Sequence, residues 1–145
     1  MKLLKTISLL TIVFFFSCQN SSTKKEKTNT ISKTNQIEVI DFYGTHRCIT
    51  CKAIEASAKH TIDTYFTEEV KKGTVSFKTV NVDDDANYNI AKKFEATGTA
   101  LFLNVIVNGK ETKIDLTDFG FEYGRNQEKF SSELKIKIEN ELKRL

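Results

Sequence analysis

The sequence has no proline and no tryptophan, and its 145 residues include three cysteines and two histidines. Proline is the residue at which a cis peptide bond is inexpensive, whereas elsewhere a cis bond costs about 3 kcal/mol. Long apolar runs are also missing, because the longest predominantly apolar segment, 7–16, has ten residues. A membrane-spanning helix needs about 20. Together with 39% hydrophobic and 28% charged residues, this excludes a polytopic membrane protein and wholesale disorder.

Most of the chain has no large excess of positive or of negative charge. The net charge is +3, but residues 1–34 hold six of the 22 basic residues and one of the 19 acidic ones. The remaining 16 basic and 18 acidic residues give residues 35–145 a net charge of −2. Proteins that bind nucleic acid neutralise its phosphates with a basic surface, so this balance argues against nucleic-acid binding. The length suits one domain with a sizeable core.

The first 18 residues have the layout of an export signal. Two lysines precede the apolar segment 7–16, and Ser17 stands directly before Cys18. This ending resembles the lipobox of bacterial lipoproteins, although two phenylalanines replace the usual leucine and small residue. The resemblance implies removal of residues 1–17 and lipidation of Cys18, whose acyl chains would anchor the protein stably. The alternatives are an uncleaved anchor and an ordinary signal in which this cysteine is incidental.

Residues 18–34 are expected to form a polar tether. Ile31 is the only bulky apolar residue in this segment, and linkers of such composition stay solvated. We expect the tether to hold a folded domain, residues 35–145, off the membrane. Lipoproteins sent to the cell surface carry an acidic stretch after the cysteine, and this chain lacks one. The resemblance therefore implies an exported, lipid-anchored and periplasm-facing protein.

Apolar periodicity predicts an α/β order for the folded part. Strands are expected over 37–43, 75–82, 101–107 and 111–116. Helices are expected from Cys48 to Gly73, from the aspartates 83–85 to near Gly98, and over 130–145. The order β-α-β-α-β-β-α joins the first three strands by helical crossovers, so we expect them to be parallel, followed by an antiparallel hairpin.

The aromatic, glycine-punctuated segment 118–126 is expected to be a loop. One interpretation is that Phe119 or Phe121 packs under the last helix. The other is a partner-docking loop near the active face. Nothing in the sequence decides between them.

If Cys18 is lipidated, the two remaining cysteines are Cys48 and Cys51, which form a C-x-x-C pair in an oxidising compartment. A strand, then C-x-x-C opening a helix, then β-α, a β-hairpin and a helix together resemble the thioredoxin fold over residues 35–145. Lys52, the Asn-Val-Asp at 81–83 and the Val-Asn-Gly-Lys at 107–110 match that family locally.

The loop before the pair resembles a smaller family more closely. Residues 44–51 read Gly-Thr-His-Arg-Cys-Ile-Thr-Cys, which is similar to the nitrophenyl compound nitroreductase subunit ArsF family. The two resemblances together imply a single thioredoxin-like domain, a mixed sheet flanked by helices, and a cysteine pair used for thiol–disulfide exchange.

The neighbours of the pair favour reactivity. Cys48 is expected at a helix N-terminus, where the helix dipole favours the thiolate that attacks disulfides. Arg47 adds a fixed positive charge beside it, and His46 adds a titratable one. Cys51 lies one turn further on the same face, so we expect Cys48 to be the exposed nucleophile and Cys51 the buried resolving thiol. The alternative is an inert structural disulfide, which would remove little unfolded-state entropy over so short a loop.

Two positions depart from the thioredoxin pattern. Where thioredoxins have a cis-proline facing the cysteine pair, this chain has Ala100, preceded by Thr99, and we expect a trans bond. The missing proline predicts a narrow range of partners and strengthens a metal-binding alternative. Asp41 has the context of the family's buried acid but lies seven residues before Cys48 instead of six. Either the loop 45–47 absorbs the extra residue, or Asp41 is an ordinary strand-end group on the other face.

The sequence therefore predicts a membrane-tethered thiol–disulfide oxidoreductase. Its partners would be thiols or disulfides of exported proteins, or a partner reductase, and no dissociable cofactor is implied. One rival is a carrier of a soft metal ion such as Cu(I), held by Cys48, Cys51 and His46. Another is a non-catalytic, partner-binding subunit. Whether the pair acts as oxidant or reductant stays open, because thiolate stabilisation by Arg47 and burial of Cys51 act in opposite directions.

Overall fold

Four strands form one mixed sheet in the order β2-β1-β3-β4. The computed structural model describes residues 35–145, so the predicted export signal (1–17), tether (18–34) and lipidated Cys18 lie outside the described residues. The strands are β1 (Gln36–Tyr43), β2 (Val75–Asn81), β3 (Ala100–Val107) and β4 (Lys110–Asp115). All four predicted strands are present.

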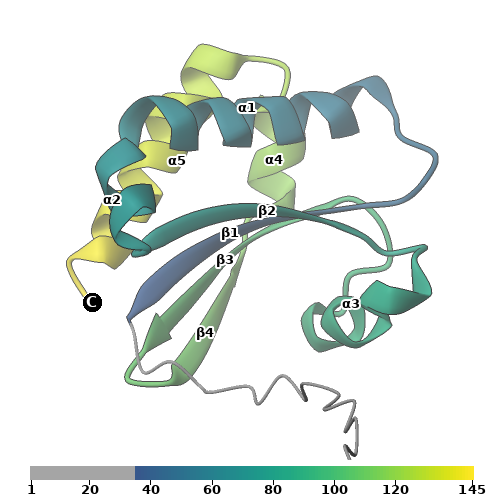
Figure 1. Ribbon diagram of the computed structural model, residues 1–145. Helices are drawn as coiled ribbons and strands as arrows, with labels where there is room; N and C mark the ends of the chain where they lie inside the picture. Colours follow the sequence, from purple (N-terminus) through teal and green to yellow (C-terminus); the bar gives the residue numbers. More distant parts are fainter. Residues whose placement is uncertain (1–34) are drawn as a thin grey trace, which may run out of the picture. The chain divides into compact units, whose positions relative to one another are not determined.

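Helices cover both faces of this sheet (Figure 1). The helices are α1 (Ile49–Tyr65), α2 (Thr67–Lys72), α3 (Tyr88–Phe94), α4 (Thr117–Tyr123) and α5 (Gln127–Leu142), with a short 3₁₀ turn at Asp85–Asn87. Helices α1, α4 and α5 pack on one face and α3 on the other. The predicted α/β domain, a mixed sheet flanked by helices, is confirmed. None of the helices within residues 35–145 is long and apolar enough to cross a membrane.

The prediction that the first three strands run parallel is wrong for the third. β1 pairs with β2 in parallel but with β3 in antiparallel orientation. The seven residues of α3 span only about 10 Å, whereas a strand of the length of β2 spans about 23 Å. The helix therefore covers less than half of that length, and it does not carry the chain back along the sheet. Figure 1 shows α3 at the end where β2 finishes, and β3 starts from that end.

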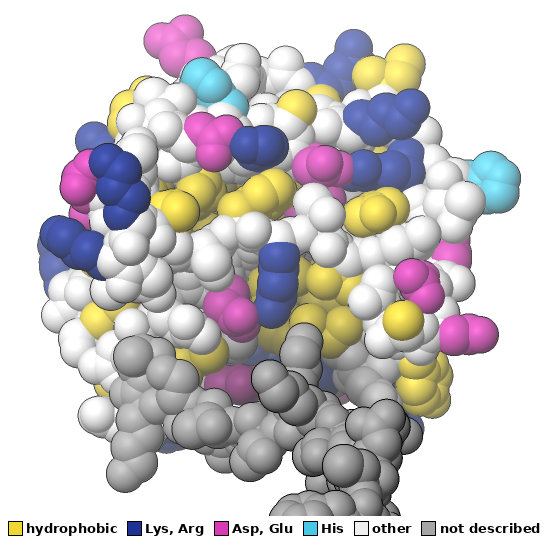
Figure 2. Space-filling model, in the orientation of Figure 1, with side chains coloured by type: hydrophobic (Ala, Val, Ile, Leu, Met, Phe, Trp, Pro, Cys, Tyr) yellow, Lys and Arg dark blue, Asp and Glu magenta, His cyan; other side chains and the backbone are white. Residues whose placement is uncertain are grey.

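Side chains of β1 contribute to two separate cores, because successive side chains of a strand point to opposite faces of the sheet. Ile37 and Val39 join the larger core with α1 and α5, and Ile40 and Phe42 join the smaller core with α3. The larger core is built mainly from Ile54, Ala58, Ile62, Phe130, Leu134 and Ile138. In the smaller core the rings of Phe42, Phe94 and Phe102 have centroids 5.3 to 5.8 Å apart. Charged side chains of both signs are interspersed over the visible surface (Figure 2).

The helix predicted from Cys48 to Gly73 is in fact two helices. The chain leaves helical geometry at Phe66, which has φ −124° and ψ 25°, and this side chain is buried in the larger core. The turn at Phe66 reorients the following residues, so Val70, expected on the apolar face, is 45% exposed. The helix ends at Gly73, as predicted, and this glycine adopts the left-handed conformation.

The segment expected as a loop is helical. Asp115 Oδ1 accepts a 2.8 Å hydrogen bond from the backbone nitrogen of Thr117 and so supports the first turn of α4. Phe119 packs on Phe130 of α5 with ring centroids 4.8 Å apart, which confirms the packing but not the loop. The short helix α3 ends earlier than expected, because Glu95 adopts φ 56° well before Gly98.

Candidate active site

The cysteine pair lies at the N-terminus of α1. Cys48 and Cys51 are joined in a disulfide, with Cα atoms 5.1 Å apart. Cys48 is the N-cap, and its Sγ accepts a 3.0 Å hydrogen bond from the backbone nitrogen of Cys51. Cys48 is exposed, whereas Cys51 is only 8% exposed. An incoming partner can therefore reach the sulfur of Cys48, while that of Cys51 faces the protein.

The loop before the pair is held by Asp83, which lies two residues after the end of β2. The backbone nitrogen of Thr45 donates a 2.6 Å hydrogen bond to Asp83 Oδ2. Hydrogen bonds from Thr45 hold the pKa of the Asp83 carboxyl below its usual range. The next residue, Asp84, caps the 3₁₀ turn, because its Oδ1 accepts a hydrogen bond from the backbone nitrogen of Ala86. His46, on the same loop, is exposed.

The guanidinium of Arg47 points inward from this loop. Its Nη2 lies 3.4 Å from Asp41 Oδ2 and 3.2 Å from the carbonyl oxygen of Cys51. Its Nη1 forms an ion pair with Glu55 of α1. The Arg47 Cζ lies 4.4 Å from the centre of the Tyr43 ring, within cation–π range. One side chain thus joins β1, the active-site loop and the first two turns of α1.

These contacts change the role expected for Arg47. The sequence suggested a positive charge available to the Cys48 thiolate. In the structure that charge faces two carboxylates, Asp41 and Glu55, which offset part of its field at the cysteine. The positive end of the α1 dipole and the hydrogen bond from the Cys51 backbone nitrogen therefore act on Cys48 without being offset in this way.

Asp41 lies on the α1 face of β1, the same face as Val39. The loop 45–47 thus absorbs the extra residue that separates Asp41 from Cys48. Asp41 is fully buried, and burial raises the pKa of its carboxyl to about 7, with Glu55 adding to the effect and Arg47 opposing it. Among residues 35–145, its Oδ1 has no hydrogen-bond partner.

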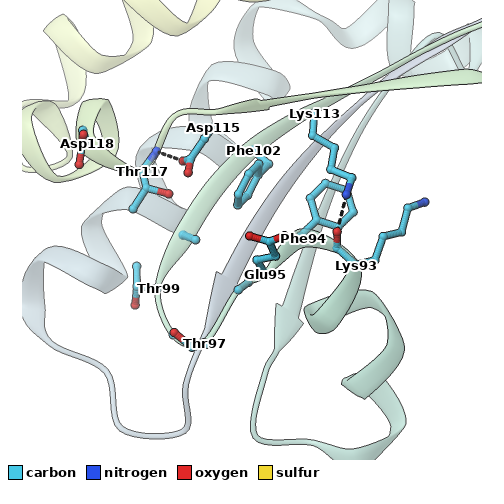
Figure 3. Close-up of a pocket in the computed structure, with 13 residues that line it drawn as sticks. Lys93, Phe94, Glu95, Thr97, Thr99, Phe102, Lys113, Asp115, Thr117 and Asp118 are labelled. Atoms are coloured by element: carbon cyan, nitrogen blue, oxygen red, sulfur yellow. Dashed lines mark hydrogen bonds between the residues drawn. The ribbon is translucent and has the colours of Figure 1, made fainter.

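Ala100 is the first residue of β3, and Thr99 directly precedes it. They line an open cavity of about 620 Å³ on the α3 side of the sheet, whose lining includes neither cysteine (Figure 3). Thr97, Thr99 and Thr117 contribute hydroxyl groups to its wall. Within residues 35–145 there is no cis peptide bond, so the bond before Ala100 is trans.

Sequence reasoning missed Glu55 and Tyr43, which complete the surroundings of Arg47. Glu55 lies four residues after Cys51, and this spacing places both on one face of α1. That spacing was a usable signal. For Tyr43 there was none, because a strand-end aromatic residue is common in any sheet.

No three His, Cys, Asp or Glu side chains between residues 35 and 145 are grouped so that they could hold a metal ion. His46 is therefore not assembled with Cys48 and Cys51 as a third ligand in the disulfide form.

A helix-opening cysteine pair beside a buried acid, on this sheet topology, defines a thioredoxin-like site. The sequence profile of the thioredoxin family matches residues 19–119, more than half of the chain, and the chain belongs to that family. Membership, together with a Cys48–Cys51 pair at disulfide distance, supports thiol–disulfide oxidoreductase activity on protein thiols or disulfides.

Two solved thioredoxin structures are similar to this chain. A Fasciola hepatica thioredoxin is 22% identical over 62% of this chain and 78% of its own length, with a TM-score of 0.42. The oxidised mitochondrial thioredoxin 3 of Saccharomyces cerevisiae is 30% identical over 66% of this chain and 81% of its own length, with a TM-score of 0.41. The comparison with curated proteins gave no match.

Proposed function

We propose that this chain exchanges disulfides with cysteine pairs of exported proteins or with a partner reductase. Cys48 is the nucleophile and Cys51 the resolving thiol. The observation that carries the proposal is the geometry of the pair: an exposed sulfur at a helix N-terminus, a buried sulfur one turn later, and a buried carboxyl on the same face of the sheet. The Gly-Thr-x-Arg-Cys-x-Thr-Cys pattern of residues 44–51 supports the finer assignment to the ArsF family.

In the reducing direction the first step forms a mixed disulfide. The Cys48 thiolate attacks one sulfur of the partner disulfide, and the other partner sulfur leaves as a thiolate. The backbone nitrogen of Cys51, which donates to Cys48 Sγ, stabilises the negative charge before the attack.

The second step releases the partner. Cys51 loses its proton and attacks Cys48 Sγ, which closes the Cys48–Cys51 disulfide and expels the second partner thiolate. The partner disulfide gains two electrons and the cysteine pair loses two. Asp41 takes up the proton from Cys51, because a carboxyl whose pKa is about 7 can accept and return protons near neutral pH. The oxidising direction is the reverse of these steps.

Substitution of each cysteine tests the assignment. With a peptide that carries one disulfide as substrate, we expect Cys48→Ser to lose at least about a thousandfold in exchange rate, since no thiolate remains at the exposed position. Cys51→Ser should instead accumulate a mixed disulfide through Cys48, visible as added mass. Cys18→Ser, which leaves the pair intact, is the matched control. An unchanged rate in Cys48→Ser would contradict the proposal, and an unchanged rate in the Cys48/Cys51 double variant would favour a non-catalytic subunit.

We also propose that the domain is held at a membrane through lipidated Cys18 and faces the periplasm. The apolar segment 7–16 and the Ser17-Cys18 ending support this. Expressed in a bacterium with lipoprotein processing, the chain is expected in the membrane fraction with an acylated N-terminus. Cys18→Ser should move it to the soluble periplasmic fraction. Recovery of unmodified chain that still begins at Met1 would contradict this part of the account.

A further inference from the structure

Arg47 makes more contacts within the protein than a charge that only flanks Cys48 would need. Its side chain is 15% exposed although the neighbouring His46 and Cys48 are exposed. One nitrogen, Nη2, contacts both the Asp41 carboxylate and the Cys51 carbonyl, and the other, Nη1, pairs with Glu55. The residue therefore connects the buried acid with the turn of α1 that carries the resolving cysteine.

We propose that Arg47 and Glu55 form a charge pair that sets the pH at which Asp41 can accept the proton of Cys51, Arg47 acting as the positioning residue. The inference rests on the proposed disulfide exchange and deepens it. It assigns to two side chains outside the cysteine pair the control of the proton transfer that accompanies resolution.

The surroundings of Asp41 leave these two charges in control. On its own sheet its register partners are Thr79 of β2 and Leu101 of β3, which carry no charge. From the loop it faces Arg47, and from α1 it faces Glu55. No other charge among residues 35–145 contributes to the raised pKa of this carboxyl.

The two charges act in opposite directions. Arg47 favours the carboxylate of Asp41 and lowers its pKa, whereas Glu55 disfavours the carboxylate and raises it. Glu55 also pairs with Arg47, and its negative charge offsets part of the effect of the Arg47 charge on Asp41. Removing Arg47 and removing Glu55 must then move the titration of Asp41 in opposite directions. A purely structural role for either residue predicts no such reversal.

The direct measurement is a carboxyl titration. Carbon-13 NMR of the full chain, labelled at aspartate and held in the disulfide form so that the cysteines do not titrate, gives the midpoint of Asp41, identified by its absence in Asp41→Asn. We expect Arg47→Gln to raise this midpoint by about one pH unit and Glu55→Gln to lower it by about half as much. Arg47→Lys should lie between the parent and Arg47→Gln, because lysine restores the charge but not the planar double contact.

Activity gives an independent reading. In the same variants, the alkaline rise of the resolution rate is expected to move with the Asp41 midpoint, to higher pH in Arg47→Gln and to lower pH in Glu55→Gln. Midpoints unmoved in a folded Arg47→Gln chain, or moved in the same direction by both substitutions, overturn the inference. Because the titration needs no turnover, a chain that never exchanges disulfides would contradict the proposed function while the titration still decides the roles of Arg47 and Glu55.

Discussion

At the residue scale, Asp41 carries the most unusual physical situation in the domain. A carboxyl with no exposed surface keeps one oxygen without a hydrogen-bond partner among the described residues and shares the other with Arg47. Burying an ionised carboxylate in this way is costly, so the folded protein holds the proton to a higher pH than the unfolded chain does.

This arrangement predicts that the free energy of unfolding depends on Asp41 with a definite sign. The carboxyl has an ordinary pKa of 3.8 and a folded pKa of about 7. Between those values folding takes up a proton, so the free energy of unfolding falls as pH rises, by about 1.4 kcal/mol per pH unit at most. Asp41→Asn removes this fall. We expect the variant to be more stable than the parent by a few kcal/mol at pH 8, and equal to it near pH 3.

Urea denaturation of both chains at several pH values measures this difference. The same variant should resolve mixed disulfides more slowly, because asparagine cannot accept the proton of Cys51. Parallel pH profiles of the two unfolding free energies would show that Asp41 ionises normally.

Much of the residue-scale picture could be predicted from the sequence. Placing a cysteine at the start of an amphipathic helix was enough to predict that Cys48 is exposed and Cys51 buried. The face on which Asp41 lies was not predictable, because it depends on whether an extra residue is taken up by strand or loop. The inward direction of Arg47 was equally hidden, since it depends on Glu55, eight residues later.

At the element scale, α4 packs closely against α1, the helix that begins at the cysteine pair. A Cβ on Gly124, just after α4, would lie 2.6 Å from Ile54 Cγ1 and 2.6 Å from the carbonyl oxygen of Gly120. Ser57 of α1 donates a 3.1 Å hydrogen bond to the Gly124 carbonyl. The glycines of the aromatic segment 118–126 thus allow α1 to pack closely against it, because they carry no side chain. Helix α1 in turn carries the cysteine pair.

Gly124→Ala is therefore expected to destabilise the domain by about 1–3 kcal/mol, the usual cost of overpacking. Gly98→Ala is the matched control, because a Cβ there meets nothing within 4 Å, and we expect a change within about 0.5 kcal/mol. Thermal unfolding of both variants decides the matter. A loss of stability in Gly124→Ala as small as that in Gly98→Ala would show that the α1–α4 contact tolerates a methyl group.

Element types were easier to predict than their ends and directions. Long periodic runs, such as α5 and β3, stand out because each buries one face or both. The break at Phe66 did not, because a buried aromatic residue fits a continuing helix equally well. The reversal of β3 did not stand out either, because the pattern of apolar residues is the same for a strand that runs in either direction.

At the scale of the whole molecule, the family, the sheet order and the cysteine pair agree on one kind of chemistry. The thioredoxin profile, the mixed sheet β2-β1-β3-β4 and a disulfide at the N-terminus of α1 are consistent with one another. Two features of this chain accompany that chemistry: Ala100 at the start of β3, where the thioredoxin pattern has proline, and the contacts of Arg47 with Asp41 and Glu55. We expect them to affect partner choice and proton transfer rather than the redox reaction itself.

The reduction potential of the Cys48–Cys51 couple tests the central claim most directly. The full chain carrying Cys18→Ser, equilibrated in glutathione buffers and analysed by thiol alkylation and mass, reports only this pair. The account predicts a reversible two-electron couple between about −120 and −270 mV, the range of thioredoxin-like exchangers. A potential below about −300 mV would mark a structural disulfide, and that result, or a pair that never oxidises, would contradict the assignment of disulfide exchange to this site.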